Sequence, residues 1–112
     1  MTDEVVLLCT CADEAEGRRL AEALVEARLA ACVNLLPGVQ SVYRWEGKLE
    51  AAREVLLLIK STAARFEELR ARITELHSYD TPEIIALPIA AGSGKYLDWI
   101  RRETAPDDSA AE

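Results

Sequence analysis

The chain has 112 residues, of which half are apolar and 29% charged, and a formal net charge of −7. This balance is typical of one globular domain and argues against intrinsic disorder. Because phosphate recognition rests on clustered Lys and Arg, the acidic charge argues against nucleic acid or an anionic membrane as a partner.

The predicted location is cytoplasmic. No apolar run approaches the length of a membrane span, and the acidic N-terminus lacks the basic residues of a signal peptide. The three cysteines cannot all pair within one chain, and in a reducing compartment they are expected to be thiols.

The first expected element is a buried strand over residues 5–11, a short and continuous apolar run. Asp13 can cap a helix that runs from about Glu14 to Leu29, and Glu16 can reach back to the amides at its start. Apolar residues recur along this helix at helical spacing, so one face of it should cover a sheet.

A long two-stranded ribbon follows. Residues 39–45 alternate with the period of a strand, which places Val39, Ser41, Tyr43 and Trp45 on one face. Glu46-Gly47 predicts a tight turn, because glycine adopts positive φ readily, and the branched apolar run of residues 55–60 is the antiparallel partner. Pro37-Gly38 predicts a bulge or bend on an edge strand, since proline has no N–H to donate.

The second half of the chain supplies another helix and strand. Ser61-Thr62 offers a cap for a helix that stops near His77, because turn residues and Pro82 follow it. A fourth strand is predicted over residues 84–89, and Ser93 can cap a short third helix. We expect a single domain over residues 1–104 and a loose acidic tail over 105–112.

The order of strands and helices predicts the fold class. Strand, helix, strand, strand, helix, strand, with a helix added at the end, is the α+β ferredoxin-like split βαβ sandwich, in which two helices cover one face of an antiparallel sheet. Such a sheet should alternate polar and apolar residues, yet the runs 5–8, 55–59 and 84–87 are apolar throughout. A second copy of the chain is the expected cover, because a bare apolar face drives association.

Five segments resemble the CutA family of divalent-cation tolerance proteins: LAACVNLLPG (29–38), YRWEGK (43–48), VLLLIK (55–60), HSYDTPEI (77–84) and YLDWI (96–100). The resemblance runs in register from Val5 to about Arg102. It implies a ferredoxin-like subunit in a tight homotrimer, whose ribbons wrap their neighbours and whose fold is similar to that of the PII signalling proteins.

The resemblance also implies a copper site. By position, the ligands would be Cys9 and His77, with Cys11 as a candidate third ligand on the same side of an extended strand. Leu76 stands where some family members have a second histidine. The alternatives are that the cysteines are small buried hydrophobes and that His77 caps the end of a helix.

A polar cleft is expected at the subunit boundary. Lys60, His77 and Tyr79 should meet there, with Thr81 and Glu83 nearby, although these groups could instead satisfy one another at strand ends. They would form the ligand-binding site of a sensor.

Tyr43 and Trp45 are expected at the trimer interface, since aromatic residues dominate interface cores. The chain has one histidine, no phosphate-cradling glycine loop and no recognisable nucleophile signature, so we do not expect an enzyme. Two functions stay open. One is a copper-binding, divalent-cation tolerance protein, and the other is a PII-like trimeric small-molecule sensor or assembly scaffold that uses the cleft.

Overall fold

The computed structural model describes residues 2–106, which form one four-stranded antiparallel sheet and three helices. Strand order in the sheet is β2-β3-β1-β4. The elements are β1 (Glu4–Cys11), α1 (Glu14–Glu26), β2 (Cys32–Trp45), β3 (Lys48–Thr62), a 3₁₀ turn (Ala63–Arg65), α2 (Phe66–Leu76), β4 (Ile85–Pro88) and α3 (Gly94–Thr104).

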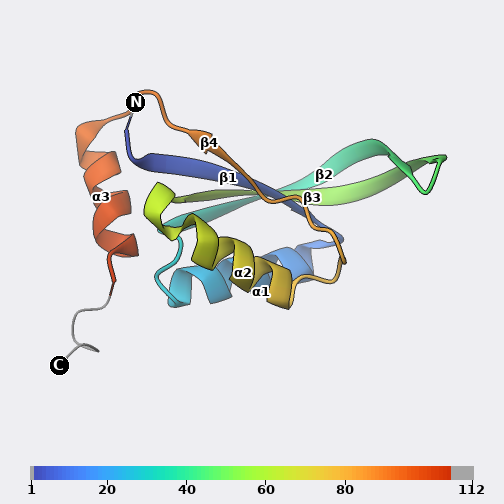
Figure 1. Ribbon diagram of the computed structural model, residues 1–112, viewed down its shortest axis with the longest axis horizontal. Coiled ribbons are helices and arrows are strands. Elements are labelled where there is room, and N and C mark those ends of the chain that lie inside the picture. The colour runs from blue at the N-terminus through green and yellow to red at the C-terminus, as the bar shows by residue number, and fades with distance from the viewer. Residues whose placement is uncertain (1, 107–112) are drawn as a thin grey trace.

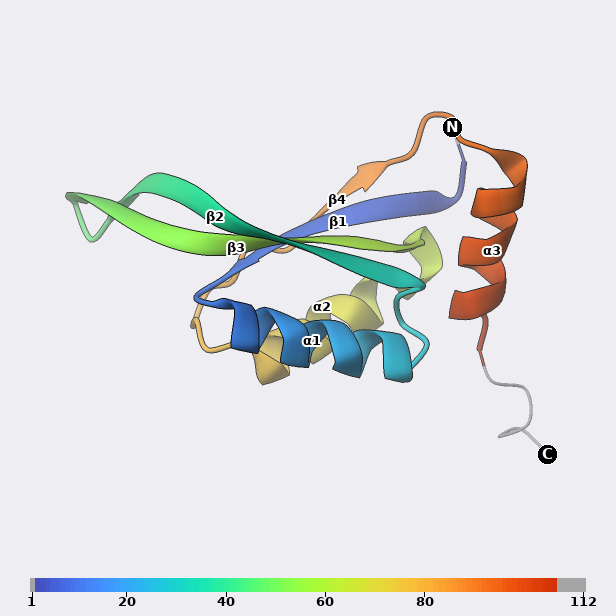
Figure 2. The same cartoon turned by 180° about the vertical axis from the view of Figure 1, so that it is seen from behind.

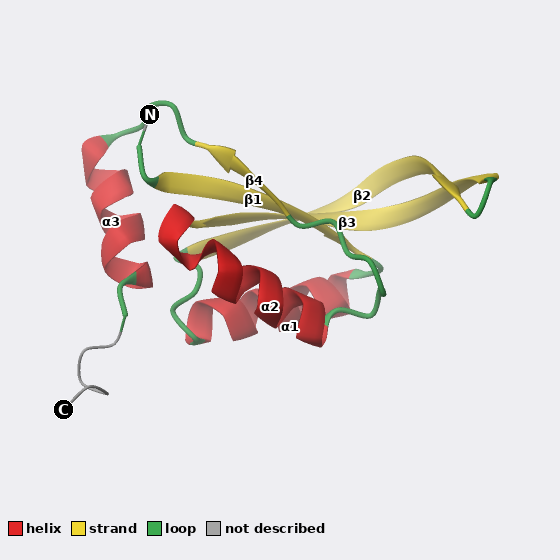
Figure 3. Ribbon diagram, viewed as in Figure 1, coloured by secondary structure: helices red, strands yellow, loops and turns green. Residues whose placement is uncertain are grey.

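The sheet forms one layer and the two helices α1 and α2 form the other, as Figure 3 shows by colour. Helix α3 stands apart at the end of the sheet near the N-terminus (Figure 1). This arrangement confirms the predicted α+β, ferredoxin-like fold class. Within residues 2–106, no helix is both long and apolar enough to cross a membrane. From residue 107 onward, the tail predicted for 105–112 lies outside the described residues.

Alternation of side chains along β1 and β3 decides what is buried. On β1, Leu7, Cys9 and Cys11 are fully buried beneath the helices, while the residues between them face the other way and are half-buried. The helices contribute the opposing half of the core. The large apolar side chains that are fully buried in this core are Leu7, Cys9, Cys11, Leu20, Leu24, Leu57, Ile59, Leu69 and Ile73.

Three local predictions for helix ends need correction. Helix α1 ends at Glu26, earlier than predicted, because Arg28 has a φ of 60° and lets the next two amides bond back to Leu24. Ser61-Thr62 does not cap α2, since β3 runs through Thr62 and a 3₁₀ turn intervenes. Ser93 makes no side-chain cap to α3. These ends depend on tertiary packing, which local pattern does not carry.

The ribbon formed by β2 and β3 extends well past the rest of the subunit (Figures 1 and 2). Its tip is the predicted two-residue turn, in which Glu46 has a φ of 50° and Gly47 a φ of 78°. Positive φ at both positions matches the twist of the two strands, which is why glycine is placed here.

The predicted bulge at Pro37-Gly38 is present on the edge strand β2. Leu36 pairs with Leu56 and Val39 with Glu54, so three steps along β2 match two along β3. Before the bulge, even-numbered residues of β2 lie on the same face as even-numbered residues of β3. The extra residue reverses this, because it shifts the alternation of side chains along β2 by one position. Beyond the bulge, the odd-numbered residues of β2 therefore lie on the face of Glu54, and this placement builds the site described below.

The face of the sheet away from α1 and α2 leaves large apolar side chains in water. The other face of the ribbon is exposed as well, 69% for Val42 and 81% for Leu49. On the face away from α1 and α2, exposure is about half for Trp45, Ile85 and Leu87. No helix of residues 2–106 covers this face in Figure 2.

Candidate functional site

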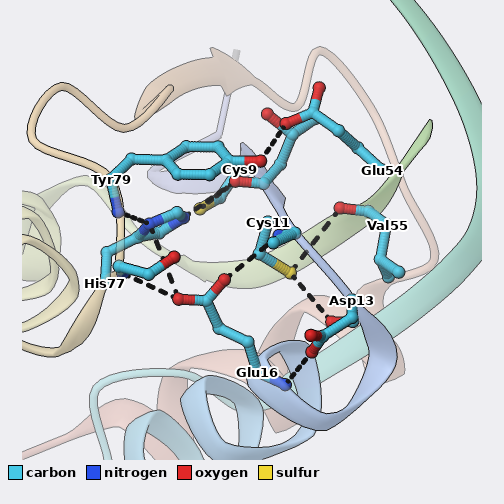
Figure 4. Close-up of polar contacts among 11 residues, drawn as sticks. Cys9, Cys11, Asp13, Glu16, Glu54, Val55, His77 and Tyr79 are labelled. Carbon is cyan, nitrogen blue, oxygen red and sulfur yellow. Dashed lines mark hydrogen bonds and ion pairs between the residues drawn. The ribbon is translucent and has the colours of Figure 1, made fainter. Parts of the chain in front are cut away.

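The site begins where β1 runs into α1. Asp13 caps α1 as predicted, because its side chain accepts the N–H of Glu16 at 2.8 Å. The carboxylate of Glu16 turns back and accepts the N–H of Ala12 at 3.1 Å and that of Ser78 at 2.7 Å (Figure 4). One buried side chain thus ties the end of β1 to the loop after α2.

Hydrogen bonding controls the charge of Glu16. Burial by itself would raise the pKa of this carboxyl, but the hydrogen bonds from Ser78 and Ala12 outweigh it, and the pKa lies below its ordinary value. Glu16 is therefore an ionised carboxylate inside the fold at neutral pH.

His77 follows α2 and lies completely buried beside Glu16, with its Nδ1 3.8 Å from Oε2 of that residue. The backbone N–H of Tyr79 donates to Nδ1 at 3.0 Å. Nδ1 must then carry a lone pair, so the proton is on Nε2 and is donated to the carbonyl oxygen of Thr10 at 2.8 Å. Both ring nitrogens are occupied, and the histidine joins β1 to the loop.

Cys9 and Cys11 point into the core beneath α1. Their sulfurs lie 3.7–3.8 Å from backbone carbonyl oxygens, so the thiols act as weak donors. Burial raises the pKa of Cys9 to about 12 and that of Cys11 to about 11. Close packing around Cys11 is extreme, since a Cβ on Gly17 would lie 3.2 Å from its sulfur.

This arrangement does not fit the copper site that Cys9, Cys11 and His77 were expected to form. Within one subunit both sulfurs are buried in the core and both imidazole nitrogens are already hydrogen-bonded, so these side chains offer no free donor atoms that converge on an ion. Among residues 2–106, no group of three or more His, Cys, Asp or Glu side chains is placed to hold a metal ion. The residues that sequence similarity singles out act together as structural parts of the core.

Tyr79 contacts both this core and a neighbouring cavity. Its hydroxyl donates to Oε2 of Glu54 at 2.8 Å, and its ring lies 4.7 Å from that of His77, centroid to centroid. Burial, together with the hydrogen bond to the Glu54 carboxylate, raises the pKa of Tyr79 above its usual range. The phenol is therefore a proton donor at all physiological pH values.

The cavity has a volume of about 600 Å³ and lies between the ribbon, the end of β1 and the loop before β4. It includes the predicted cleft residues Tyr79, Thr81 and Glu83, and also Tyr43 and Trp45 from the ribbon. The bulge in β2 makes this meeting possible, because it puts the two ribbon aromatics on the face of Glu54. The other lining residues are Thr10, Ser41, Val42, Glu54 and Asp80.

Lys60 does not join this group, so the expected meeting of Lys60 with His77 and Tyr79 is wrong within the subunit. Lys60 pairs with Val6, near the start of β1, and its Nζ bonds the side chain of Asn34. It lies six residues from Glu54 on β3, which is about 20 Å along a strand. Because β3 runs antiparallel to β1, Lys60 lies beside the start of β1, whereas His77 bonds Thr10 near the end of β1.

Sequence reasoning missed Glu54, the carboxylate at the inner wall of the cavity. The available signal was weak, because Glu54 follows another charged residue, Arg53, directly before the apolar run of β3. Glu16 was recognised as a capping residue but not as the link to His77 and Ser78, because the loop that it binds lies 62 residues away.

Comparison with known proteins gives one consistent family. The family model described as CutA1 divalent ion tolerance protein matches residues 5–103. The chain is 52% identical over 101 residues to the divalent-cation tolerance protein CutA of Thermus thermophilus, which covers 90% of this chain and 98% of that one. The protein from Arabidopsis thaliana named "Protein CutA, chloroplastic" is 45% identical over 100 residues, 89% of this chain and 55% of the plant protein.

The fold agrees with this family. The solved structure of the divalent cation tolerance protein (Cut A1) from Thermus thermophilus superposes with a TM-score of 0.89 at 51% identity, covering 91% of this chain and 99% of that one. The chain therefore belongs to the CutA1 divalent ion tolerance protein family.

Proposed function

We propose that the protein is a cytoplasmic homotrimer that takes part in the response to metal ions. It acts as a non-catalytic sensor or scaffold through the cavity around Glu54. The observation that carries this proposal is the contrast between two groups of residues. Cys9 and His77 are buried, with their donor atoms occupied, whereas the cavity is open and lined by polar and aromatic groups.

The homotrimer is supported by the uncovered apolar surface of the ribbon and the helix-free face. On the helix-free face Trp45, Ile85 and Leu87 are each about half exposed, and on the opposite face of the ribbon Leu49 is 81% exposed and Val42 69%. Large exposed apolar patches mark interfaces, and a closed ring of copies would cover every such patch equally. We assign Tyr43 and Trp45 to this interface, at the boundary where the cavity opens.

A non-catalytic role is supported by the state of the ionisable groups. The chain has one histidine, and both of its ring nitrogens are engaged in hydrogen bonds within the core. The thiols of Cys9 and Cys11 are protonated and buried, so neither is an activated nucleophile. The free cysteines are also in keeping with a reducing compartment such as the cytoplasm.

Copper titration separates this proposal from the copper site. We would measure the affinity for Cu(I), against a competing chelator, in the wild type and in Cys9→Ser, which keeps the size of the side chain. The proposal expects the same affinity in both proteins. A tight site in the wild type that is lost in Cys9→Ser would refute it and restore copper as the ligand.

Light scattering tests the assembly. A mass three times that of one chain is expected at micromolar concentration, and a monomer would refute the homotrimer.

A further inference from the structure

All the charged side chains that line the cavity are acidic. Its ten lining residues include three carboxylates, from Glu54, Asp80 and Glu83, and no Lys, Arg or His. They also include three aromatic side chains, Tyr43, Trp45 and Tyr79. A volume of about 600 Å³ is in the range of small-molecule sites.

Glu54 is the unusual member of this set. The residue is only 8% exposed, yet no basic side chain of residues 2–106 forms an ion pair with it. The hydroxyl of Tyr79 bonds Oε2, whereas within residues 2–106 no hydrogen bond is made to Oε1, which solvent reaches. A buried carboxylate without a counter-ion is costly. Oε1 therefore offers an unfilled acceptor to a cation that enters the cavity.

The free acceptor Oε1 of Glu54 indicates which kind of cation the cavity can bind. A bare metal ion needs several oxygen ligands that converge at about 2–2.6 Å, and no group of three such side chains in residues 2–106 is arranged to do this. A quaternary ammonium has no N–H to donate to Oε1. A protonated amine supplies both the charge and the donor, and aromatic side chains attract it further through cation–π interactions.

The spread of charge indicates more than one amine. Asp80 and Glu83 are exposed at the loop side of the cavity, while Glu54 is buried on β3. A ligand that carries two ammonium groups joined by methylenes satisfies both ends, and its apolar stem lies against the ribbon aromatics. We propose that this cavity binds an aliphatic diamine or polyamine, with one ammonium on Glu54 and another on the carboxylates of Asp80 and Glu83. This inference rests on the proposed function of the cavity and specifies its ligand.

Calorimetric titration with 1,4-diaminobutane tests the inference on the assembled protein. Glu54→Gln keeps the size of the side chain and removes the charge, and should weaken binding about 10- to 100-fold, the range for a charge-assisted hydrogen bond. Glu83→Gln, at an exposed position, should weaken it about threefold to tenfold, because solvent screens that carboxylate. Glu22→Gln, on the exposed side of α1, is the control and should bind as the wild type does.

Matched ligands identify what is recognised. Butane-1,4-diol has the same length without charge and should not bind. Tetramethylammonium carries an organic cation's charge without an N–H donor and should bind much more weakly than the diamine. Mg²⁺ carries charge as a bare metal ion and should not compete with the diamine for the cavity.

Equal affinity of wild type and Glu54→Gln for the diamine would overturn the inference. So would a trimer that does not bind the diamine, the result expected if a basic side chain of a neighbouring copy fills the cavity. If Glu54→Gln fails to fold, an unchanged affinity in Glu83→Gln overturns it instead. A copper site lost in Cys9→Ser, or a monomeric mass, would count against the proposed function, whereas amine failure in a copper-independent trimer counts against this inference alone.

Discussion

Replacing Glu16 should weaken the fold at the place where α1, β1 and the loop after α2 join. The carboxylate accepts two backbone N–H groups, from Ala12 and Ser78, and is itself only 4% exposed. In Glu16→Ala both donors lose their acceptor. Each unsatisfied group costs about 1–3 kcal/mol, and because the two bonds are partly buried we expect a total loss of about 2–4 kcal/mol in the free energy of unfolding.

Glu16→Gln should be intermediate. The amide keeps one oxygen for one of the two N–H groups, but its NH₂ faces the other donor, so the expected loss is about 1–3 kcal/mol. Glu14→Gln is the matched control, since Glu14 lies in the same first turn and is exposed. It should change stability by less than about 1 kcal/mol, through the helix dipole alone.

The loss should depend on pH in a defined direction. The pKa of Glu16 is lowered in the fold, so the carboxylate contributes its full stabilisation above the ordinary value of 4.5. That contribution disappears as the pH falls through the lower, folded value, because the unfolded chain then binds the proton first. The difference between wild type and Glu16→Gln should therefore shrink in acid.

Guanidinium denaturation followed by circular dichroism measures these differences. All variants are compared at one protein concentration, because the midpoint of an oligomer depends on it. Equal midpoints for wild type and Glu16→Gln at pH 7, or a difference that is the same at pH 7 and pH 3, would contradict the reasoning from the hydrogen bonds.

Three further results are expected. In a thiol-reagent assay on the native protein, half-buried Cys32 should react first, and Cys9 and Cys11 only as fast as the fold opens, since burial raises their pKa values to about 12 and about 11; equal rates for all three would contradict the buried placement. Nitrogen NMR should find the ring proton of His77 on Nε2, and the Nδ1–H tautomer would show that the contacts with Thr10 and Tyr79 are misassigned. Trp45→Ala should weaken the assembly by a few kcal/mol if this half-exposed side chain is an interface anchor, whereas an unchanged mass and melting temperature would remove the ribbon from the interface.

The sequence by itself determined the elements and their order. Period-two alternation, helical spacing and turn chemistry act between near neighbours, so the strands, the Glu46-Gly47 turn, the bulge at Pro37-Gly38 and the cap at Asp13 could be located from the residues alone. The order of the elements and the apolar character of the strands were then enough to predict the fold class. The end of α1 near Arg28 could not be located in this way, because the side chain of Arg28 bonds the carbonyl oxygens of Arg102 and Ala105, which lie 74 and 77 residues away.

The tertiary structure decided which side chains meet. Tyr79, Thr81 and Glu83, which are neighbours in one loop, line one cavity of the subunit, whereas Lys60 lies beside the start of β1. An apolar strand gives no sign of which end faces which neighbour until its register with β1 is known.

Glu54 shows the same limit in its strongest form. The sequence located the bulge, but only pairing Leu36 with Leu56 and Val39 with Glu54 reveals that one extra residue turns Tyr43 and Trp45 toward that carboxylate. Register is a long-range property: a shift of one residue moves every side chain to the opposite face, while the local pattern of each strand stays the same.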